Sequence, residues 1–230
     1  MFKGIFVVGT DTGVGKTIVA AGIAGALHRL GIDVGVMKPV SAGSREDARF
    51  LRKSVESTDP IDLVNPVHLR LPLAPYVAAK LLKKRIGLEK IDYAFKVLSK
   101  KHKFLIVEGA GGVLVPIQKR FLVADLVRKF SLPALVVARA TLGTLNHTLL
   151  TIEALRSRKI QVVGILLNGL EPKHRDLAVR TNPKILREFS GLPILGILPR
   201  LEGVDVRSCQ YGSLFESVAR HVQLNLLRKI

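Results

Sequence analysis

The chain contains 230 residues, of which 48% are hydrophobic, and it carries a formal net charge of +18. This length and apolar content favour one folded domain spanning residues 1–230 and exclude a disordered polymer. The single cysteine, Cys209, excludes an internal disulfide. The start of the chain lacks the pattern of a secretion signal, and no apolar run approaches the roughly 20 residues that span a bilayer. We therefore expect a cytoplasmic protein without a membrane segment.

The positive charge comes from 36 Lys and Arg residues against 18 Asp and Glu residues. Such a charge would suit nucleic acid, an acidic membrane surface or anionic small substrates. The basic residues lie in short groups near the ends of predicted helices, where cations complement the helix dipole. Trp is absent and aromatic residues make up 5% of the chain, so no platform for stacking single strands is visible. A solvated basic surface is favoured, and neither nucleic acid nor a membrane is expected as a partner.

Apolar runs rich in β-branched residues alternate with helix-like runs along the whole chain. Buried strands are predicted at residues 4–8, 34–37, 104–107, 134–137, 162–167 and 194–197. Helices are predicted at residues 16–30, 47–54, 75–84, 88–99, 124–130, 143–156 and 183–189. Strands that are apolar throughout and separated by helices indicate an α/β fold, with a mostly parallel central β-sheet and helices on both faces. Ligands bind such sheets at the carboxyl ends of the strands.

The sequence GTDTGVGKT, residues 9–17, joins the first predicted strand to the first predicted helix. A phosphate-binding loop needs a glycine-rich turn with exposed N–H groups, a helix amino terminus, a lysine for the β and γ phosphates and a hydroxyl for Mg²⁺. Residues 13–17 supply all four. The segment departs from the common pattern, because Thr10 stands where the opening glycine is expected and Gly9 lies one residue earlier. It nevertheless predicts a nucleotide-binding P-loop, and hence a P-loop NTPase-like fold.

Charged residues directly follow two further predicted strands. Lys38 ends the second strand and is placed to face the ligand crevice, although a lysine that caps a sheet edge would occupy the same position. Asp47 opens the next helix, where a capping carboxylate and a Mg²⁺ ligand are equally compatible with the sequence. Glu108 ends the third strand, where nucleotide-binding folds place a carboxylate for the metal. The glycines in residues 109–112 let the backbone approach a ligand closely.

Three later segments also follow predicted strands. The sequence LGTLNH, residues 142–147, opens a helix whose exposed amides could hold an anion. An ordinary cap by Thr144 or Asn146 is at least as compatible with this sequence. Asn168 with the glycine after it, and residues 199–201, either border a base or form plain turns.

Several motifs together resemble the dethiobiotin synthetase family, in order and approximate spacing, over most of the chain: GTDTGVGKT, KPV-x-x-G, the helix carrying Asp47, VEGAGG followed by VP, LGTLNHTLLT, the strand ending in Asn168, and G-x-LP. The resemblance implies a ligase of biotin biosynthesis that forms carbon–nitrogen bonds. In that family 7,8-diaminononanoate, CO₂ and ATP give dethiobiotin, ADP and phosphate. One amine captures CO₂ as a carbamate, the carbamate oxygen attacks the γ-phosphate, and the second amine closes the cyclic urea.

The resemblance also implies roles for individual residues, with ATP as co-substrate and Mg²⁺ as cofactor. Mg²⁺ would be held by Thr17, Asp47 and Glu108. The catalytic residues would be Lys16, Lys38 and Thr12, with Lys38 between the carbamate and the γ-phosphate and Thr12 at the γ-phosphate. The nucleotide would contact Gly13, Val14, Gly15, Lys16, Thr17, Ile18, Asp47, Glu108, Gly109, Ala110, Gly111, Asn168, Gly169, Pro199, Arg200 and Leu201. The substrate would contact Ser41 and Ala42 and, from the second subunit of a homodimer, Gly143, Thr144, Leu145 and Asn146.

One departure from the family concerns the substrate. The family usually has Ser or Thr at the position of Ala42, so either a neighbouring hydroxyl replaces that contact or the contact is lost.

The main alternative is a nucleotide-switched partition or septum-site ATPase that binds DNA or membrane, since its loop also ends in G-x-G-K-T. Such an ATPase needs a signature lysine five residues before Lys16, where this chain has Asp11. It also leaves Lys38 and the glycines after Glu108 unexplained. A relative that makes cobyrinic acid diamide would need a further glutaminase domain with a catalytic cysteine, for which a 230-residue chain with only Cys209 leaves no room.

Overall fold

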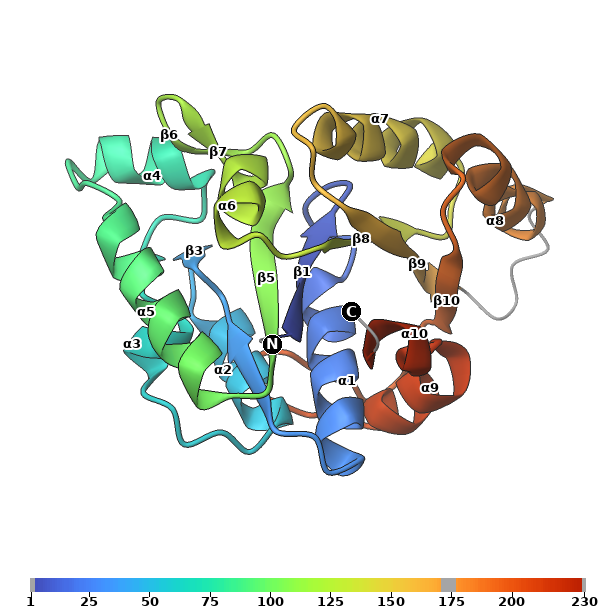
Figure 1. The fold of residues 1–230 in the computed structure, drawn as a ribbon, viewed down its shortest axis with the longest axis horizontal. Helices are drawn as coiled ribbons and strands as arrows, with labels where there is room; N and C mark the ends of the chain where they lie inside the picture. The colour runs from blue at the N-terminus through green and yellow to red at the C-terminus, as the bar shows by residue number, and fades with distance from the viewer. Residues whose placement is uncertain (1–2, 171–176, 229–230) are drawn as a thin grey trace.

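The computed structural model describes residues 3–170 and 177–228. Within these residues a six-stranded sheet forms the centre of the molecule, with the strand order β10-β9-β8-β1-β5-β2 (Figure 1). Every neighbouring pair in this sheet is parallel. The strands are β1 (Lys3–Gly9), β2 (Val34–Met37), β5 (Phe104–Gly112), β8 (Ala134–Arg139), β9 (Val162–Leu170) and β10 (Ile194–Pro199). The predicted α/β fold with a parallel central sheet is confirmed.

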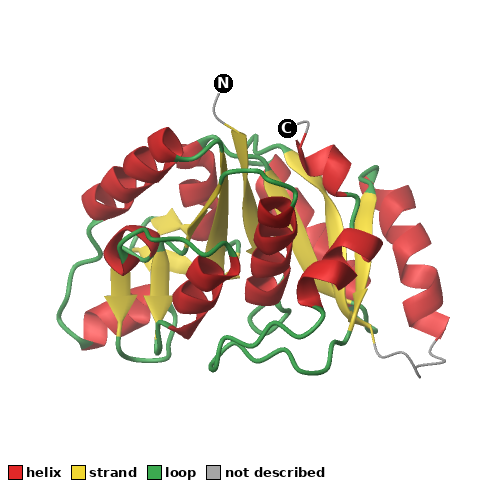
Figure 2. Ribbon diagram, turned by 90° about the horizontal axis from the view of Figure 1, so that it is seen from below, coloured by secondary structure: helices red, strands yellow, loops and turns green. Residues whose placement is uncertain are grey.

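Helices cover both faces of this sheet, because its strands are apolar on both sides (Figure 2). Side chains alternate along β1, so Ile5 and Val7 lie in one hydrophobic core and Phe6 and Val8 in the other. The core with Ile5 is covered by α1 (Lys16–Arg29), α2 (Glu46–Ser54), α3 (Ile61–Val64), α9 (Leu214–His221) and α10 (Leu224–Arg228). The core with Phe6 is covered by α4 (Pro75–Leu81), α5 (Leu88–Lys101), α6 (Val123–Phe130), α7 (Thr144–Arg156) and α8 (Leu177–Ser190). None of the described helices is long and apolar enough to cross a membrane.

The place of β1 in the sheet positions the P-loop. β1 pairs with β5 on one side, where Val7 lies opposite Glu108, and with β8 on the other, where Val8 lies opposite Val136. The loop that follows β1 therefore emerges between the carboxyl ends of β5 and β8. β5, β8 and β9 also run past their predicted ends, so their last residues extend the sheet into the region where ligands bind.

Several elements differ from the prediction. The helix predicted at 183–189 spans Leu177–Ser190, with Pro183 inside it. The prediction began at the proline because proline favours the first turn, but buried Asn182 and Leu186 hold the longer helix against the protein. The helix predicted at 75–84 ends at Leu81. Not predicted were α3, α9, α10, the parallel pair β3 (Val40–Ala42) with β4 (Val67–Leu69), and the antiparallel pair β6 (Pro116–Gln118) with β7 (Phe121–Leu122).

An ion cluster around the buried Asp59 joins the segments that precede β2 and β5. Asp59 is fully buried, accepts a hydrogen bond from Lys101 Nζ at 2.5 Å, and lies 2.9 Å from Nε2 of His102. The other ring nitrogen of His102 lies 2.7 Å from Asp33. Burial alone would raise the pKa of Asp59, but hydrogen bonds from Lys101, Ser57 and His102 hold this pKa below its usual range. The ionised carboxylate therefore stabilises the fold above its ordinary pKa, and this stabilisation is lost as the pH falls through the lower folded value.

Asp59→Asn is expected to lower the free energy of unfolding at pH 6 by about 1 to 3 kcal/mol, because Lys101 and His102 lose their ionic partner. The difference from wild type should shrink as the pH falls from about 5 to about 2, where the wild-type carboxylate takes up its proton. Urea unfolding across this range measures both effects. Asp92→Asn, which breaks a half-exposed pair with Lys129, is the control and should cost less than about 1 kcal/mol. A difference between wild type and Asp59→Asn that did not change with pH would contradict the lowered pKa.

Candidate active site

The loop between β1 and α1 is shaped by three glycines. Gly13 and Gly15 have φ angles of 74° and 89°, in the left-handed region that other residues rarely adopt. A side chain on Gly9 would lie 2.9 Å from both Nζ of Lys16 and the carbonyl oxygen of Asp11. The lysine folds back over this glycine and donates a hydrogen bond to the Asp11 carbonyl at 2.9 Å. Gly9, which lies one residue earlier than the glycine of the common pattern, is therefore required because the Lys16 side chain occupies the space of a side chain there.

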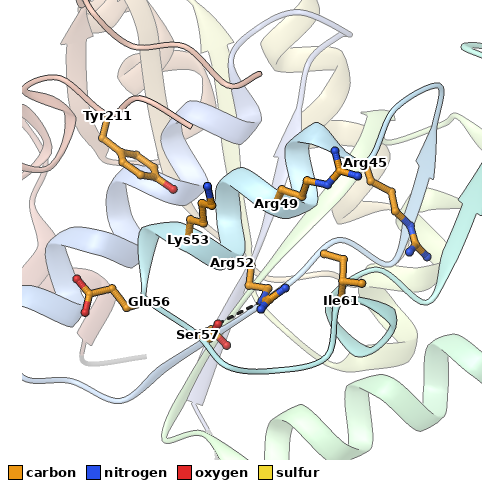
Figure 3. A pocket seen from close by; sticks show the side chains of 8 residues that line it. All are labelled: Arg45, Arg49, Arg52, Lys53, Glu56, Ser57, Ile61 and Tyr211. Atoms are coloured by element: carbon orange, nitrogen blue, oxygen red, sulfur yellow. Dashed lines mark hydrogen bonds between the residues drawn. The ribbon is translucent and has the colours of Figure 1, made fainter. Parts of the chain in front are cut away.

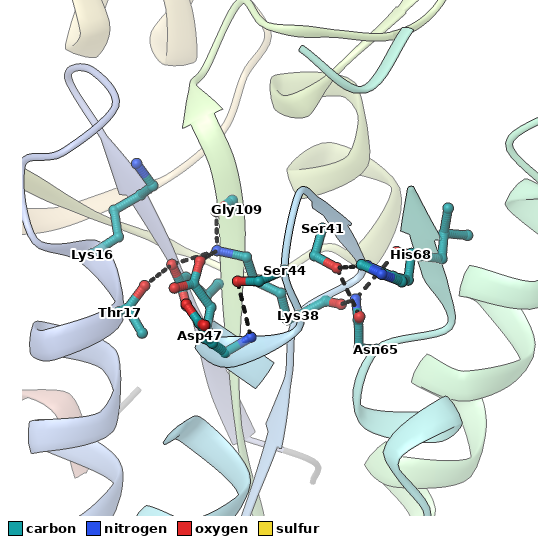
Figure 4. Close-up of polar contacts among 12 residues, drawn as sticks. Lys16, Thr17, Lys38, Ser41, Ser44, Asp47, Asn65, His68 and Gly109 are labelled. Atoms are coloured by element: carbon teal, nitrogen blue, oxygen red, sulfur yellow. Dashed lines mark hydrogen bonds and ion pairs between the residues drawn. The ribbon is translucent and has the colours of Figure 1, made fainter. Parts of the chain in front are cut away.

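Four polar side chains meet beside the loop (Figure 4). Lys38 Nζ donates hydrogen bonds to Glu108 at 2.6 Å and to Asp47 at 2.9 Å. The Thr17 hydroxyl donates to the same oxygen of Glu108 at 2.7 Å. The side chains of Lys38 and Glu108 are 5% and 1% exposed, whereas that of Asp47 is 42% exposed. The structure thus brings together the three residues predicted to hold the metal and the lysine predicted to act at the γ-phosphate.

Burial and charge pairing set the protonation of this cluster. Burial raises the pKa of Glu108, against the opposing effect of Lys38. Burial would lower the pKa of Lys38, but Glu108 and Asp47 raise it above its ordinary value. Burial would also raise the pKa of Asp47, yet Lys38 holds it below its usual range. Lys16 differs from Lys38, because burial outweighs the attraction of Glu108 and lowers the pKa of Lys16 to about 8. Lys38 is therefore the more firmly protonated of the two lysines.

The oxygen donors of the cluster fit Mg²⁺. This ion takes oxygen ligands and is usually bound by one or two carboxylates together with water and substrate phosphates. Glu108, Asp47 and Thr17 offer two carboxylates and a hydroxyl. The second oxygen of Glu108 is buried without a hydrogen-bond partner, which leaves an acceptor for a cation. Within residues 3–170 and 177–228 there is no group of three or more His, Cys, Asp and Glu side chains that could hold a metal. Water and substrate phosphates would complete the shell around these three donors.

A cavity of about 400 Å³ opens beside Lys38. Thr12, Lys38 and Asp47 are its polar walls at the end next to the P-loop. The remaining walls are mainly apolar, and they are formed by Val40, Ser41, Ala42, Pro72, Leu73, Ala74, Pro75, Ala110, Gly111 and Val115. Residues 72–75 were not predicted to line a site, because they follow a short strand that the sequence pattern did not reveal. The cavity combines charged and apolar walls, as a substrate with an aliphatic chain requires.

Ser41 lies in the cavity wall, but its hydroxyl is engaged within the protein. It donates a hydrogen bond to Oδ1 of Asn65 at 2.8 Å and lies 3.1 Å from Nδ1 of His68 (Figure 4). The Asn65 amide in turn donates to the carbonyl oxygen of Lys38 at 2.7 Å. Ser41 and Asn65 therefore fix the backbone that carries Lys38, and a substrate contact to Ser41 would compete with Asn65. Asn65 was missed, since a polar residue between two short elements carries no recognisable pattern.

Asn168 contacts the P-loop from the end of β9. Its side-chain amide donates a hydrogen bond to the carbonyl oxygen of Val14 at 3.0 Å. A side chain on Gly15 would come within 2.0 Å of the same nitrogen. Leu198 of β10 lies opposite Asn168, which places residues 199–201 beside it. Of the residues predicted to border the base, Asn168 therefore contacts the phosphate loop, and residues 199–201 lie at the end of the strand that pairs with β9.

Arg139 was missed by the sequence analysis. It ends β8, and its Nη2 atom donates a hydrogen bond to the carbonyl oxygen of Thr12 at 3.0 Å. The signal was available, because Arg139 is a cation at the carboxyl end of a buried strand, as Lys38 is. The other predicted nucleotide residues lie in the P-loop, the first turn of α1, and the same ends of β5, β9 and β10: Gly13, Val14, Ile18, Gly109, Ala110, Gly111, Gly169, Pro199, Arg200 and Leu201.

The turn before α7 lies apart from this cavity. Gly143 has a φ angle of 88° at the start of α7, and Thr144 is buried with its hydroxyl 3.3 Å from that of Thr148. None of residues 143–146 lines the cavity beside Lys38. The preceding Leu142 is 83% exposed. Within one chain, the predicted substrate contacts at residues 41–42 and those at residues 143–146 therefore belong to different surfaces.

Comparison with known proteins gives many relatives over most of the chain. A protein-family model described as "AAA domain" matches residues 3–208. The ATP-dependent dethiobiotin synthetase BioD of Thermodesulfovibrio yellowstonii is 43% identical over 216 residues, which cover 87% of this chain and 90% of that protein. The same-named protein of Endomicrobium trichonymphae is 45% identical over 200 residues, covering 85% and 92%. That of Bacillus licheniformis is 40% identical over 230 residues, covering 98% and 95%.

Solved structures with a similar fold include cell division ATPases. MinD of Pyrococcus furiosus superposes with a TM-score of 0.63 at 16% identity, covering 100% of this chain and 99% of that one. The septum site-determining protein MinD of Pyrococcus horikoshii, solved with Mg-ADP, gives 0.60 at 17% identity, covering 100% and 96%. At such low identity the likeness confirms the P-loop NTPase-like fold and nothing further, so the switch ATPase is not favoured. By its sequence relatives, the chain belongs to the ATP-dependent dethiobiotin synthetase family.

Proposed function

We propose that this chain, acting as one P-loop domain, converts 7,8-diaminononanoate, CO₂ and ATP into dethiobiotin, ADP and phosphate. The proposal rests on the position of Lys38. This buried lysine lines the cavity and also contacts both carboxylates beside the P-loop. A switch ATPase has no need for a charged residue between its nucleotide and an apolar cavity, whereas phosphorylation of a second small molecule requires one.

The proposed reaction brings two anions together. The carbamate oxygen must approach the γ-phosphate, and positive charge must offset their repulsion and stabilise the transferring phosphoryl group. Lys38 would lie between the two anions and contact both. Its raised pKa keeps it protonated, so it would supply the positive charge. Lys16 would leave the Asp11 carbonyl and bind the phosphate oxygens. Thr12, which lines the same cavity, would contact the γ-phosphate from the loop side.

Thr17, Asp47 and Glu108 would hold Mg²⁺. When bound, the ion supplies positive charge at the phosphate oxygens. In the structure, Lys38 and Thr17 hold Glu108 by hydrogen bonds, and Lys38 also holds Asp47. The lysine thus orients both carboxylates and keeps Asp47 ionised, because it lowers the pKa of that group.

The apolar part of the cavity suits the rest of the substrate. Val40, Ala42, Leu73 and Val115 offer a surface for its methylene chain. These walls also restrict water, which would otherwise hydrolyse the mixed anhydride before the second amine closes the ring. The carboxylate at the far end of the chain needs a separate anion site. We propose that residues 143–146 of the second subunit of a homodimer supply it.

The first test is release of phosphate by the purified protein with ATP, Mg²⁺ and bicarbonate, with and without 7,8-diaminononanoate. Dethiobiotin is followed by mass spectrometry in the same samples. Phosphate release that depends on the diamine and equals the dethiobiotin formed is the expected result. Hydrolysis that ignores the diamine but rises with DNA or lipid vesicles would instead identify a switch ATPase.

Mixing two inactive variants tests whether each active site combines residues from both subunits. Lys38→Ala removes the lysine from one site, and Asn146→Asp places a negative charge where the substrate carboxylate would bind. Each variant alone is expected to lose activity. In a mixed dimer, one site combines the intact Lys38 of one chain with the intact Asn146 of the other, so mixing should restore activity. If mixing restored nothing although exchange of subunits was demonstrated, each chain would hold a complete site by itself.

A further inference from the structure

A second cavity, of about 600 Å³, lies on the outer side of α2, and the proposed reaction does not use it (Figure 3). Its lining comes from α2 and the residue before it, the segment after α2, α3 and the carboxyl-terminal part of the chain: Arg45, Arg49, Arg52, Lys53, Glu56, Ser57, Ile61 and Tyr211. Four of these residues are cationic and one is a carboxylate. We call this site the α2 cavity.

The cations share one side of α2 because they recur three or four positions apart. Arg49 lies four residues after Arg45 and four before Lys53, and like charges at this spacing destabilise a helix. Arg45 is also the residue that precedes the first turn, where the helix dipole disfavours a cation. The arrangement therefore opposes helix stability at two points. Asp47 lies on another side of the same helix and contacts Lys38, so the α2 cavity is distinct from the active site.

The protein neutralises only part of this charge. Arg45 pairs with Asp62 at 2.7 Å, yet its Nε atom is buried without a hydrogen-bond partner. Arg52 donates a hydrogen bond to the carbonyl oxygen of Ser57 at 3.2 Å. In residues 3–170 and 177–228, Arg49, Arg52 and Lys53 form no ion pair. Arg49 and Lys53 are exposed to solvent, so a bound anion would replace water as their partner.

We propose that the α2 cavity binds a small anion that carries two or more phosphoryl groups. Guanidinium groups match phosphate oxygens with paired hydrogen bonds, and three arginines line the site. The volume lies in the range of small-ligand pockets. One wall is rigid, since the Tyr211 ring stacks on Phe50 with 4.5 Å between centroids and its hydroxyl donates to the Phe50 carbonyl at 2.7 Å. A concave site that also contains the Glu56 carboxylate suits a compact ligand better than a long nucleic-acid strand.

The test titrates inorganic tripolyphosphate into the full-length protein by calorimetry. Because the P-loop would also bind this probe, the titrations use Lys16→Ala as the background. Adding Arg49→Ala and Lys53→Ala is expected to weaken binding at least about tenfold, the loss that follows from removing one charge-assisted hydrogen bond. The matched control adds Lys96→Ala and Lys100→Ala instead, which removes the same charge at the same spacing from exposed positions of α5. This control is expected to bind as the background does.

Three outcomes would overturn the proposal. The background could fail to bind tripolyphosphate, or the α2 and α5 variants could lose affinity equally, which would mean a general effect of surface charge. A single-stranded oligonucleotide could bind the wild type and lose affinity only in the α2 variant while tripolyphosphate did not, which would make this face a nucleic-acid surface. Arg49→Gln with Lys53→Gln, which keeps the side-chain length, must reproduce the alanine result. ADP in the same titrations distinguishes nucleotide from inorganic phosphate as the source of the bound groups.

Discussion

Lys38→Ala is expected to lower the single-turnover rate of dethiobiotin formation by about 10³-fold or more, because the carbamate and the γ-phosphate lose the charge that offsets their repulsion. The affinity for ADP should change by less than about tenfold, since Lys16 and the backbone of the P-loop still bind its phosphates. Rapid-quench measurement of phosphate gives the rate, and calorimetry with ADP gives the affinity. Lys16→Ala provides the contrast, because it should lose affinity and rate together.

The Lys38 variant also removes the ion-pair partner of the buried Glu108, so its stability has to be measured separately. Lys38→Met fills the same space and should show the same catalytic loss as Lys38→Ala. Thermal unfolding of both variants tells whether the fold survives. Equal losses of ADP binding and of turnover in two folded variants would mean that Lys38 is a binding residue and not the group between the reacting anions.

Gly15→Ala is expected to weaken ADP binding by about 100-fold or more, since about 3 kcal/mol of distortion would fall on the loop that binds the phosphates. The added carbon would lie 2.0 Å from the side-chain amide of Asn168, and the φ angle of 89° is unfavourable for alanine. Either Asn168 must give up its hydrogen bond to the Val14 carbonyl or the loop must move, and both changes, together with the unfavourable φ angle, disturb the N–H groups that would bind the phosphates. Calorimetry with ADP and Mg²⁺ measures the effect.

Gly31→Ala is the matched control for this prediction. Gly31 has a φ angle of 77°, similar to that of Gly15, but nothing lies within 4 Å of the position that a side chain would take. Gly31→Ala should therefore destabilise the fold by about 1 to 2 kcal/mol and leave ADP binding unchanged. Combining Gly15→Ala with Asn168→Ala would remove the clash and leave the strain. Similar ADP affinities for Gly15→Ala and Gly31→Ala would show that contact with Asn168 does not shape the loop.

The strand ends were the most predictable part of the site. In a parallel sheet the strands are apolar throughout, so a charged residue such as Lys38 or Glu108 marks the end where ligands bind. That rule placed both residues, and the structure shows them in contact. It failed for Arg139 only because the predicted strand ended too early. A local sequence pattern is enough to predict such site residues, because the geometry of the sheet brings the strand ends together.

Other parts of the site depend on contacts that no local pattern records. Asn65 holds the Lys38 carbonyl across 27 positions of sequence, and the turn at 72–75 reaches the cavity only because β4 pairs with β3. Short strands and helices of a few residues carry too little periodicity to be recognised. By contrast, α9 could have been predicted, because Leu214, Phe215 and Val218 follow a helical spacing.

Asn168 ties the end of the site proposed for the base to the loop proposed for the phosphates, through its hydrogen bond to the Val14 carbonyl. Any substitution of Asn168 that altered the choice of base would also release the P-loop. Selection for a different nucleoside triphosphate would therefore be confined to positions that can vary independently of the loop, such as residues 199–201. We expect family members with different base preferences to retain the asparagine and to diverge in the turn after β10.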